Sequence, residues 1–207
     1  SELQALQSQI NPHFLYNTLD SIIWMAEGRK YEEVVLMTAS LARLLRQSIS
    51  NEDEVVPLAR EVEYAKGYLT IQKMRYKDKL EFEIDVEPSI LNIPLIKLVL
   101  QPIIENAIYH GLKYKESKGL LQVKGFMKDG NAVLQVIDNG VGMDEETLSH
   151  IYDKHKVNYH SNGVGVYNVQ KRLKLYYGEN YGITYESEKG VGTTATITIP
   201  GIQEESI

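Results

Sequence analysis

The sequence predicts an α+β protein, in which an N-terminal helical hairpin is followed by an α/β sandwich. Apolar residues recur at helical spacing through residues 1–77. From Leu80 onward, alternating apolar and polar residues indicate strands, and shorter helical stretches separate them. The connection Lys128–Asn131 is typical of a hairpin turn between antiparallel strands. Helices should therefore cover one face of a mixed sheet.

Three helices are expected in the N-terminal region. The first ends near Ala26, because the next four residues, 27–30, include a glycine that suits a helix stop. The second ends in a polar stretch at residues 50–53, and Pro57 opens the third in the favoured first turn. The first two helices, joined by a short turn, should form an antiparallel hairpin.

The sequence indicates a dimer interface at the start of the chain. Leu3, Leu6 and Ile10 have the three-then-four spacing of a coiled-coil seam. The hairpin is therefore expected to pair with a second copy as a four-helix bundle, and a helical domain within one chain is the alternative. Because the pattern is already helical at Ser1, we expect an upstream helix to run into it.

The second half of the chain is expected to hold five strands and three helices. The strands are predicted at 80–86, 120–127, 132–138, 181–187 and 193–199. The helices are predicted at 94–111, about 144–152 and 164–177. The change of pattern places the domain division after residue 77, with a helical region at 1–77 and an α/β domain at 78–207.

Composition narrows the class of protein. The chain has 207 residues, with 22 basic and 28 acidic side chains and a net charge of −6. This balance, without a basic run, argues against a nucleic-acid partner. Cysteine is absent, which excludes disulfides and thiolate metal sites and fits a reducing compartment. No apolar stretch is long enough to span a bilayer, so membrane attachment is expected only through upstream segments.

A histidine beside a proline is the first candidate functional residue. His13 follows Pro12 inside a helical pattern, and the proline removes a backbone donor and should kink the helix there. A histidine at a kink is a candidate for chemistry, although a surface or core histidine is the alternative. The apolar face of this helix is expected to hold Leu15, Leu19, Ile22 and Ala26.

Polar residues near the end of the helix at 94–111 form a second candidate site. Asn106, His110 and Lys113 are spaced to share one helical face if the helix persists past Gly111. An amide oxygen such as that of Asn106 can ligate Mg²⁺. The imidazole of His110 and the ammonium group of Lys113 can then contact phosphate oxygens.

Three further motifs suit a nucleotide. Asp138 ends a buried strand, where its carboxylate can accept a hydrogen bond from an exocyclic amine, as on adenine. Gly140 and Gly142 would let the backbone close on the base. The other two motifs are Gly163 with Gly165, which open a helix whose unpaired N–H groups suit a phosphate, and Gly190–Thr193, which leads into the last strand. Each motif alone is also a common turn signal.

The order and spacing of these motifs resemble a known domain. Residues 80–200 are similar to the ATP-binding domain shared by histidine kinases, gyrase-type ATPases, Hsp90 and MutL, the GHKL or Bergerat fold. In this resemblance Asn106 matches the N box, residues 138–142 the first glycine box and residues 163–165 the second. The resemblance implies binding of ATP and Mg²⁺, with Thr193 among the nucleotide contacts.

The N-terminal motif resembles one subfamily of these proteins. Residues 9–19 are similar to the phosphoacceptor box of LytS/YesM-type sensor histidine kinases, and residues 61–76 to their connecting helix. The resemblance implies the dimeric cytoplasmic kinase core of a membrane-bound sensor. It would phosphorylate His13 from ATP and pass the phosphate to an aspartate of a response regulator. Asn17, one turn beyond His13, is a candidate for orienting water in dephosphorylation, and a capping role is its alternative.

Two departures from related families limit this interpretation. Phe14 follows His13 where many histidine kinases have an acidic residue, so the general base is not identified. Pro102 stands where gyrase-type ATPases carry a catalytic glutamate, which argues against ATP hydrolysis as the main activity. A serine kinase or ATPase of the same fold, and a non-catalytic nucleotide-binding module, are the alternative functions.

Overall fold

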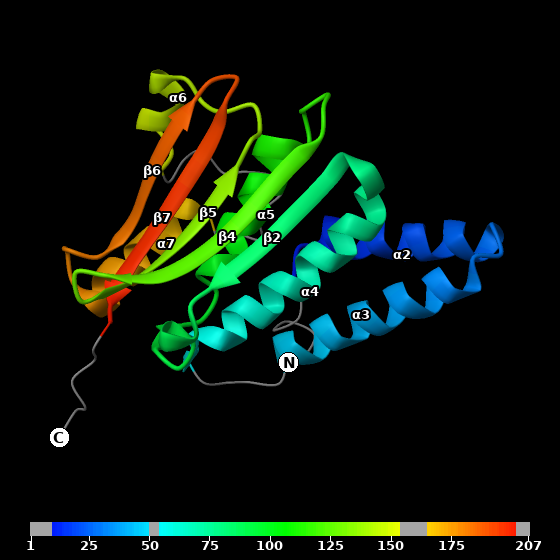
Figure 1. The fold of residues 1–207 in the computed structure, drawn as a ribbon, viewed down its shortest axis with the longest axis horizontal. Coiled ribbons are helices and arrows are strands. Elements are labelled where there is room, and N and C mark those ends of the chain that lie inside the picture. The colour runs from blue at the N-terminus through cyan, green and yellow to red at the C-terminus, as the bar shows by residue number, and fades with distance from the viewer. Residues whose placement is uncertain (1–9, 50–53, 154–164, 202–207) are drawn as a thin grey trace.

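The computed structural model describes residues 10–49, 54–153 and 165–201, and it places a helical hairpin beside a sheet that helices cover on one face (Figure 1). The hairpin consists of α2 (Pro12–Glu27) and α3 (Tyr31–Ile49). Gly28 caps the end of α2 by donating its N–H to the carbonyl of Trp24 at 2.9 Å. The predicted antiparallel hairpin and its glycine turn are therefore confirmed.

The start of α2 differs from the prediction. Pro12 lies in the first turn of the helix and produces no kink within it, because first-turn N–H groups have no partner inside a helix. Asn11 is the N-cap, and its side-chain oxygen accepts the His13 N–H at 2.9 Å. Of the predicted coiled-coil seam, Leu3 and Leu6 lie outside the described residues. Ile10 is buried in the core of this chain.

The buried face of α2 is also rotated from the predicted face. Phe14 and Thr18 are fully buried, whereas Leu19 and Ala26 are exposed. Leu15 and Ile22, the other members of the predicted face, are partly buried against the core. The rotation arises because α2 packs on α4 as well as on α3, and a large aromatic ring occupies that contact.

A short sheet joins the two halves of the chain. Strand β1 (Val55–Pro57) pairs antiparallel with β3 (Pro94–Ile96), and α4 (Leu58–Tyr76) follows β1 directly. Two predictions are corrected here. Pro57 precedes α4 as its N-cap, and the segment from Pro94 begins as a strand instead of a helix. The two prolines face each other at the end of the ladder, where their missing N–H groups remove the fewest hydrogen bonds from the sheet.

The main sheet has five strands in the order β2-β4-β5-β7-β6. Their bounds are β2 Leu80–Val86, β4 Gly119–Lys128, β5 Asn131–Asp138, β6 Gly182–Glu188 and β7 Gly192–Pro200. Strands β2 and β4 are parallel and all other neighbours antiparallel, so the predicted mixed sheet is confirmed. Asp129 and Gly130 both have positive φ (51° and 80°), as the tight turn between β4 and β5 requires.

Helices cover one face of this sheet (Figure 1). α4 packs on β2 and on α5 (Leu100–Asn106), and α7 (Val166–Tyr177) packs on β6 and β7. A π-helical turn, η3 (Ala107–Leu112), continues α5 and contacts β5. The remaining elements are α6 (Glu145–Ser149) and the short 3₁₀ turns η1 (Lys77–Lys79) and η2 (Pro88–Ile90). Most of the buried apolar residues of both halves form one continuous core.

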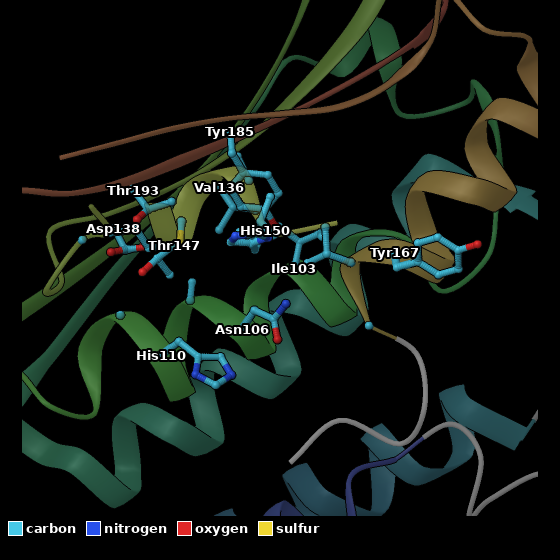
Figure 2. Close-up of a pocket in the computed structure, with 18 of the residues that line it drawn as sticks. Ile103, Asn106, His110, Val136, Asp138, Thr147, His150, Tyr167, Tyr185 and Thr193 are labelled. Carbon is cyan, nitrogen blue, oxygen red and sulfur yellow. The ribbon is translucent and has the colours of Figure 1, made fainter. Parts of the chain in front are cut away.

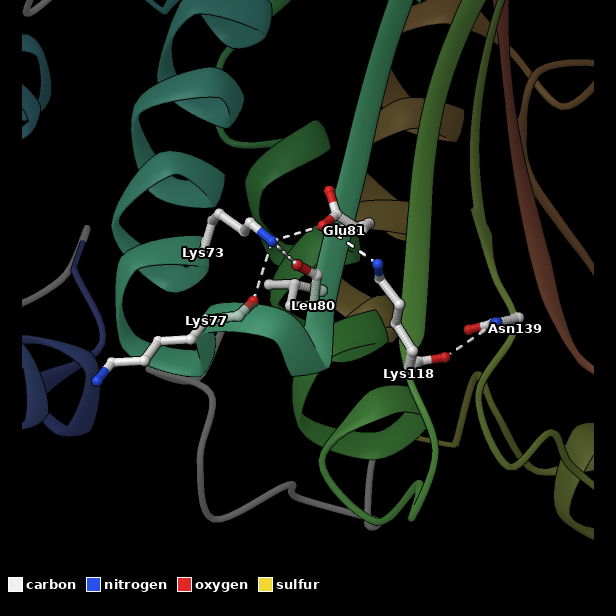
Figure 3. Close-up of polar contacts among 6 residues, drawn as sticks. All are labelled: Lys73, Lys77, Leu80, Glu81, Lys118 and Asn139. Carbon is white, nitrogen blue, oxygen red and sulfur yellow. Dashed lines mark hydrogen bonds and ion pairs between the residues drawn. The ribbon is translucent and has the colours of Figure 1, made fainter.

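The side chain of Lys73 connects the end of α4 to the start of β2 by hydrogen bonds (Figure 3). Lys73 Nζ donates to the carbonyls of Lys77 and Leu80, at 3.0 and 2.7 Å, and to Glu81 Oε1 at 2.6 Å. Lys118 Nζ lies 3.4 Å from the same Glu81 oxygen. Lys73 first, and Lys118 second, lower the pKa of the Glu81 carboxyl. Within the described ranges, no helix is both long and apolar enough to cross a membrane.

Candidate functional site

A cavity of about 530 Å³ lies between the helical layer and the sheet (Figure 2). Its walls come from α5, η3, β5, β6, β7, α6 and the first residues of α7. The apolar lining includes Ile103, Ala107, Val136, Ile151, Val166 and Ala195. The polar lining includes Asn106, His110, Asp138, Thr147, His150 and Thr193. An apolar slot with a few converging polar groups is the usual form of a small-molecule site.

Asp138 places a buried carboxyl group in the wall of this cavity. It ends β5, as predicted, and only 7% of the residue is exposed. Its Oδ1 accepts the N–H of Gly140 at 2.9 Å, and the backbone N–H of Thr193 also stabilises the carboxylate. Burial nevertheless raises the pKa of Asp138 to about 6, so the carboxyl is poised to gain from a further hydrogen-bond donor.

The glycines after Asp138 allow segments of the chain to approach closely. A Cβ on Gly140 would collide with the carbonyl of Gly111, and the neighbouring Val141 N–H donates to that carbonyl at 2.9 Å. Gly142 has φ +65° and lies against the carbonyl of Glu188. These contacts lock the loop onto η3 and the β6–β7 turn, and this locking keeps Asp138 in place.

The structure brings Asn106 and His110 to the cavity but leaves Lys113 outside its lining. The expectation that all three share a face depended on a continuing α-helix. The π-helical turn places more residues in each turn than the roughly 3.6 of an α-helix, so positions beyond Gly111 rotate away. Lys113 is exposed, and its ammonium lies 5.8 Å from the ring centroid of Tyr114.

The two remaining predicted motifs also border the cavity where they are described. Gly165 is the N-cap of α7 and lines the cavity, and no described residue other than its chain neighbour comes within 4 Å of the position of a Cβ. Gly163 lies outside the described residues. Thr193 lines the opposite wall, where its Oγ1 is 2.7 Å from the Oγ of Ser187.

His13 and Asn17 lie on a different part of the molecule. Both side chains are exposed on α2, one helical turn apart, and neither is among the described residues that line the cavity. Phe14, between them, turns inward and stacks on Tyr68 of α4 with the ring centroids 4.8 Å apart. The residues of the predicted phosphoacceptor box and those of the predicted nucleotide site therefore lie on separate parts of the described chain.

Several lining residues were missed by the sequence analysis. Tyr185 of β6 lines the cavity, and its buried hydroxyl has no hydrogen-bond partner among the described residues. Thr147, His150 and Tyr167 also line the cavity, although the ring of Tyr167 points away from the other labelled side chains (Figure 2). The alternation along β6 predicts that Tyr185 shares a face with Ile183, but it does not indicate that this face borders a cavity.

Glu105 is a second buried carboxyl, next to Asn106 but outside the cavity lining. It is 9% exposed and accepts a hydrogen bond from Gln101 Nε2 at 3.1 Å. Burial raises its pKa to about 7. It lies close enough to Tyr64 and Tyr68 of α4 to raise the pKa of both hydroxyls, after the larger effect of their burial.

Comparison with known proteins matches two successive segments of the chain to two families. Residues 1–80 match the family described as histidine kinase. Residues 92–203 match the family of histidine kinase-, DNA gyrase B- and HSP90-like ATPases. The chain belongs to the sensor histidine kinase family. It is 37% identical over 200 residues, or 97% of its length, to the sensor histidine kinase YesM of Bacillus subtilis.

Other relatives agree with this assignment. The sensor protein LytS of Oceanobacillus iheyensis is 33% identical over 87% of the chain. The chain spans about a third of the length of these relatives, 33% of YesM and 31% of LytS. The fold matches the histidine kinase domain of a blue-light activated kinase from Erythrobacter litoralis, with a TM-score of 0.52, 16% identity and coverage of 96% and 90% of the two chains. Membership of the family implies an ATP-binding kinase domain.

Proposed function

We propose that this chain is the catalytic core of a two-component sensor. It transfers the γ-phosphoryl group of ATP to His13 and then to an aspartate of a response regulator. The observation that carries the proposal is the cavity, which sets a buried carboxylate in an apolar slot and amide and imidazole groups on a facing helix. This is the donor and acceptor set that an adenine nucleotide requires.

The residues fit an adenine at the Asp138 side. The carboxylate uses Oδ1 for the loop N–H of Gly140 and keeps lone pairs for the exocyclic amine. Val136 and Ala195 come from the sheet and Ala107 from η3, so apolar side chains line the slot on both sides of a planar base. Gaining that amine donor favours the ionised form of the buried carboxyl. Thr193 would border the base beside Asp138.

The facing helix would bind the phosphates. The amide oxygen of Asn106 would hold Mg²⁺, and His110 would contact phosphate oxygens. Bound Mg²⁺ would neutralise phosphate charge during the transfer. The start of α7 at Gly165 would support an anion there, because the N–H groups of a first helical turn have no partner within the helix.

His13 supplies the nucleophile. Its imidazole is exposed on α2, and a neutral imidazole is an adequate nucleophile for an in-line attack. The proton acceptor is not the next residue, because Phe14 is apolar and turned into the core. Transfer requires the cavity and His13 to approach each other, either by movement of the hairpin or by use of a second protomer.

A homodimer through α2 and α3 is part of the proposal. Both helices expose large apolar side chains that this chain leaves uncovered, as a bundle interface would. They are Tyr16, Leu19, Ile23 and Trp24 on α2, and Tyr31, Val35 and Leu36 on α3. The complete protein would be longer, as its relatives are, and would attach this cytoplasmic core to a membrane through other segments.

Phosphate labelling tests the function. The parent chain and His13→Gln would be incubated with Mg²⁺ and γ-labelled ATP, and ATP affinity measured on the same preparations. We expect acid-labile label on the parent, none on His13→Gln, and equal ATP affinity. Acid-stable label that persists in His13→Gln would indicate a serine kinase. Released phosphate without labelled protein would indicate an ATPase, and ATP binding without either would indicate a non-catalytic module.

A further inference from the structure

Glu61 is a buried carboxylate on α4 whose partners lie in the ATP-binding half of the chain. It is 7% exposed. Its Oε1 accepts the backbone N–H groups of Val99 at 2.7 Å and Leu100 at 3.3 Å. These are the residues at which α5 begins, where N–H groups have no partner within the helix. A buried carboxylate is tolerated only with such hydrogen bonds, so Glu61 and the start of α5 depend on each other.

Arg172 on α7 holds the same turn from the other side. Its Nη1 donates to the carbonyl of Leu98 at 3.0 Å, and its Nη2 donates to the carbonyl of Lys97. The carbonyls of the turn therefore face the guanidinium, while its N–H groups face the carboxylate. Glu61 and Arg172 attract each other across these peptide units. Burial raises the pKa of Glu61, and the N–H groups and Arg172 oppose that rise.

The backbone of the turn indicates that these contacts hold it in place. Leu98 has φ +60°, in the left-handed region that residues other than glycine seldom adopt. Such a conformation persists only where the surrounding contacts determine it. In the described part of the chain, Glu61 bonds the N–H groups of this turn and Arg172 bonds its carbonyls. Loss of either would let the turn relax and would move the first residue of α5.

Both helices held at this turn lead to the cavity. α5 runs from Leu100 to Asn106, which lies about 9 Å further along the helix axis at roughly 1.5 Å per residue. α7 runs back from Arg172 to Gly165 at its start, and Gly165 also lines the cavity. A displaced turn would therefore move the Asn106 side of the cavity more than Asp138, because Asp138 belongs to β5 and its carboxylate accepts the N–H of Gly140.

We propose that Glu61 is a positioning residue that aligns the phosphate side of the nucleotide cavity by fixing the start of α5. This inference rests on the proposed function, because it takes the phosphates of an adenine nucleotide to lie at Asn106. Glu61 does not line the cavity and acts through α5 and, together with Arg172, through α7. Through Glu61, α4 supports the cavity, and α4 also contacts the helical hairpin.

The test compares ligands that differ only in their phosphates. Affinities for adenosine, ADP and a non-hydrolysable ATP analogue with Mg²⁺ would be measured by calorimetry on the full chain. Glu61→Gln keeps the packing volume and one acceptor but sets an NH₂ group against the N–H donors of the turn. We expect it to weaken the ATP analogue about tenfold and adenosine less than about twofold. The matched control is Glu63→Gln, an exposed glutamate on the same helix, which should leave all three affinities unchanged.

The pattern of affinities separates positioning from mere stability. An equal loss for all three ligands, or no loss, would overturn the inference. If Glu61→Gln does not fold, Arg172→Lys decides by the same criterion, because it keeps the charge and loses the two-carbonyl contact. Asp138→Asn serves as the check on the proposed function. Failure of the parent to bind ATP, or unchanged binding in Asp138→Asn, would refute that function itself, whereas equal behaviour of the two glutamate variants would refute only the role of Glu61.

Discussion

Phe14 stacks on Tyr68 with their ring centroids 4.8 Å apart and their planes inclined by 38°. Phe14 is the residue that follows His13, and Tyr68 lies in the middle of α4, so this pair joins α2 to α4, the helix that packs on β2. Both rings are fully buried. Tyr68 is also held at its hydroxyl, which accepts a hydrogen bond from Gln72 Nε2 at 2.9 Å. The stack therefore turns the Phe14 face of α2 toward α4.

Removing the ring of Phe14 should destabilise the chain. We expect Phe14→Ala to lower the free energy of unfolding by about 3–5 kcal/mol, through lost burial and the cavity left beside Tyr68. Urea denaturation measures the change. The control is Tyr114→Ala, an exposed aromatic residue, which should alter stability by no more than about 0.5 kcal/mol. A loss below about 1 kcal/mol for Phe14→Ala would show that the stack is not a structural anchor.

Nucleotide binding should depend on the ionisation of Asp138. Burial raises the pKa of this carboxyl to about 6, and only the ionised form can accept the adenine amine fully. Affinity for adenosine, which carries no phosphate of its own, should be constant well above that pKa. Below it, affinity should fall about tenfold for each unit of pH.

The measurement is adenosine affinity from about pH 5 to about pH 8 for the parent and Asp138→Asn. The variant should bind more weakly than the parent above the pKa of Asp138, and its affinity should not follow the pH. A variant that shows the same pH dependence as the parent would assign the titration to another group. A variant that binds adenosine as the parent does would remove Asp138 from the base site.

Glu105 should make stability depend on pH. Its pKa is raised from 4.5 in a free carboxyl to about 7, mainly by burial. The folded state therefore holds a proton that the unfolded chain has already released between these two values. The free energy of unfolding should fall as pH rises through this window, by up to about 3 kcal/mol, and should then level off above it.

Glu105→Gln should remove this component, because the amide stays neutral and can still accept from Gln101. The difference in stability between variant and parent should grow with pH and become constant above the pKa of Glu105. Urea denaturation at several pH values measures it. Glu63→Gln, which changes an exposed carboxyl, should follow the parent at every pH. A pH-independent difference for Glu105→Gln would show that Glu105 does not titrate in this window.

Elements with strong local patterns were predicted well from the sequence. The alternation of Leu80–Val86 and the turn Lys128–Asn131 depend on neighbouring residues alone, and both are confirmed. The start of α5 was not, because Pro94–Ile96 becomes a strand only by pairing with β1, a partner distant in sequence. The burial of Phe14 in place of Leu19 has the same cause, since α4 decides which face of α2 is covered.

Some residues of the candidate site also have a local signal in the sequence, and others do not. Asp138 was found because it ends a strongly apolar strand, and Asn106 with His110 because they stand one helical turn apart. Lys113 was placed wrongly relative to that face, since the π-helical turn depends on how η3 packs against β5 and leaves no simple signal in the sequence. Glu61 had no signal either, because its partners are backbone N–H groups that every sequence contains.

Asn17 should act in the removal of phosphate from a receiver. It is exposed on α2, one turn beyond His13, and the helix places both side chains on one face. An amide can orient a water molecule by hydrogen bonds without taking its proton. That property suits hydrolysis of a phosphoaspartate on a docked receiver and is not needed for attack by His13 on ATP.

We therefore expect Asn17→Ala to keep phosphorylation of His13 near the parent rate and to slow loss of phosphate from the receiver about tenfold or more. Both rates would be measured on one preparation, since a misfolded fraction would lower them together. Asn17 is exposed and its carbonyl, not its side chain, accepts from Ser21 at 2.9 Å, so truncation should leave α2 intact. Asn17→Gln, which keeps the amide but moves it outward, should be intermediate in dephosphorylation. If the kinase and phosphatase rates fall together, Asn17 serves the forward reaction or the bundle, and a role in orienting water is excluded.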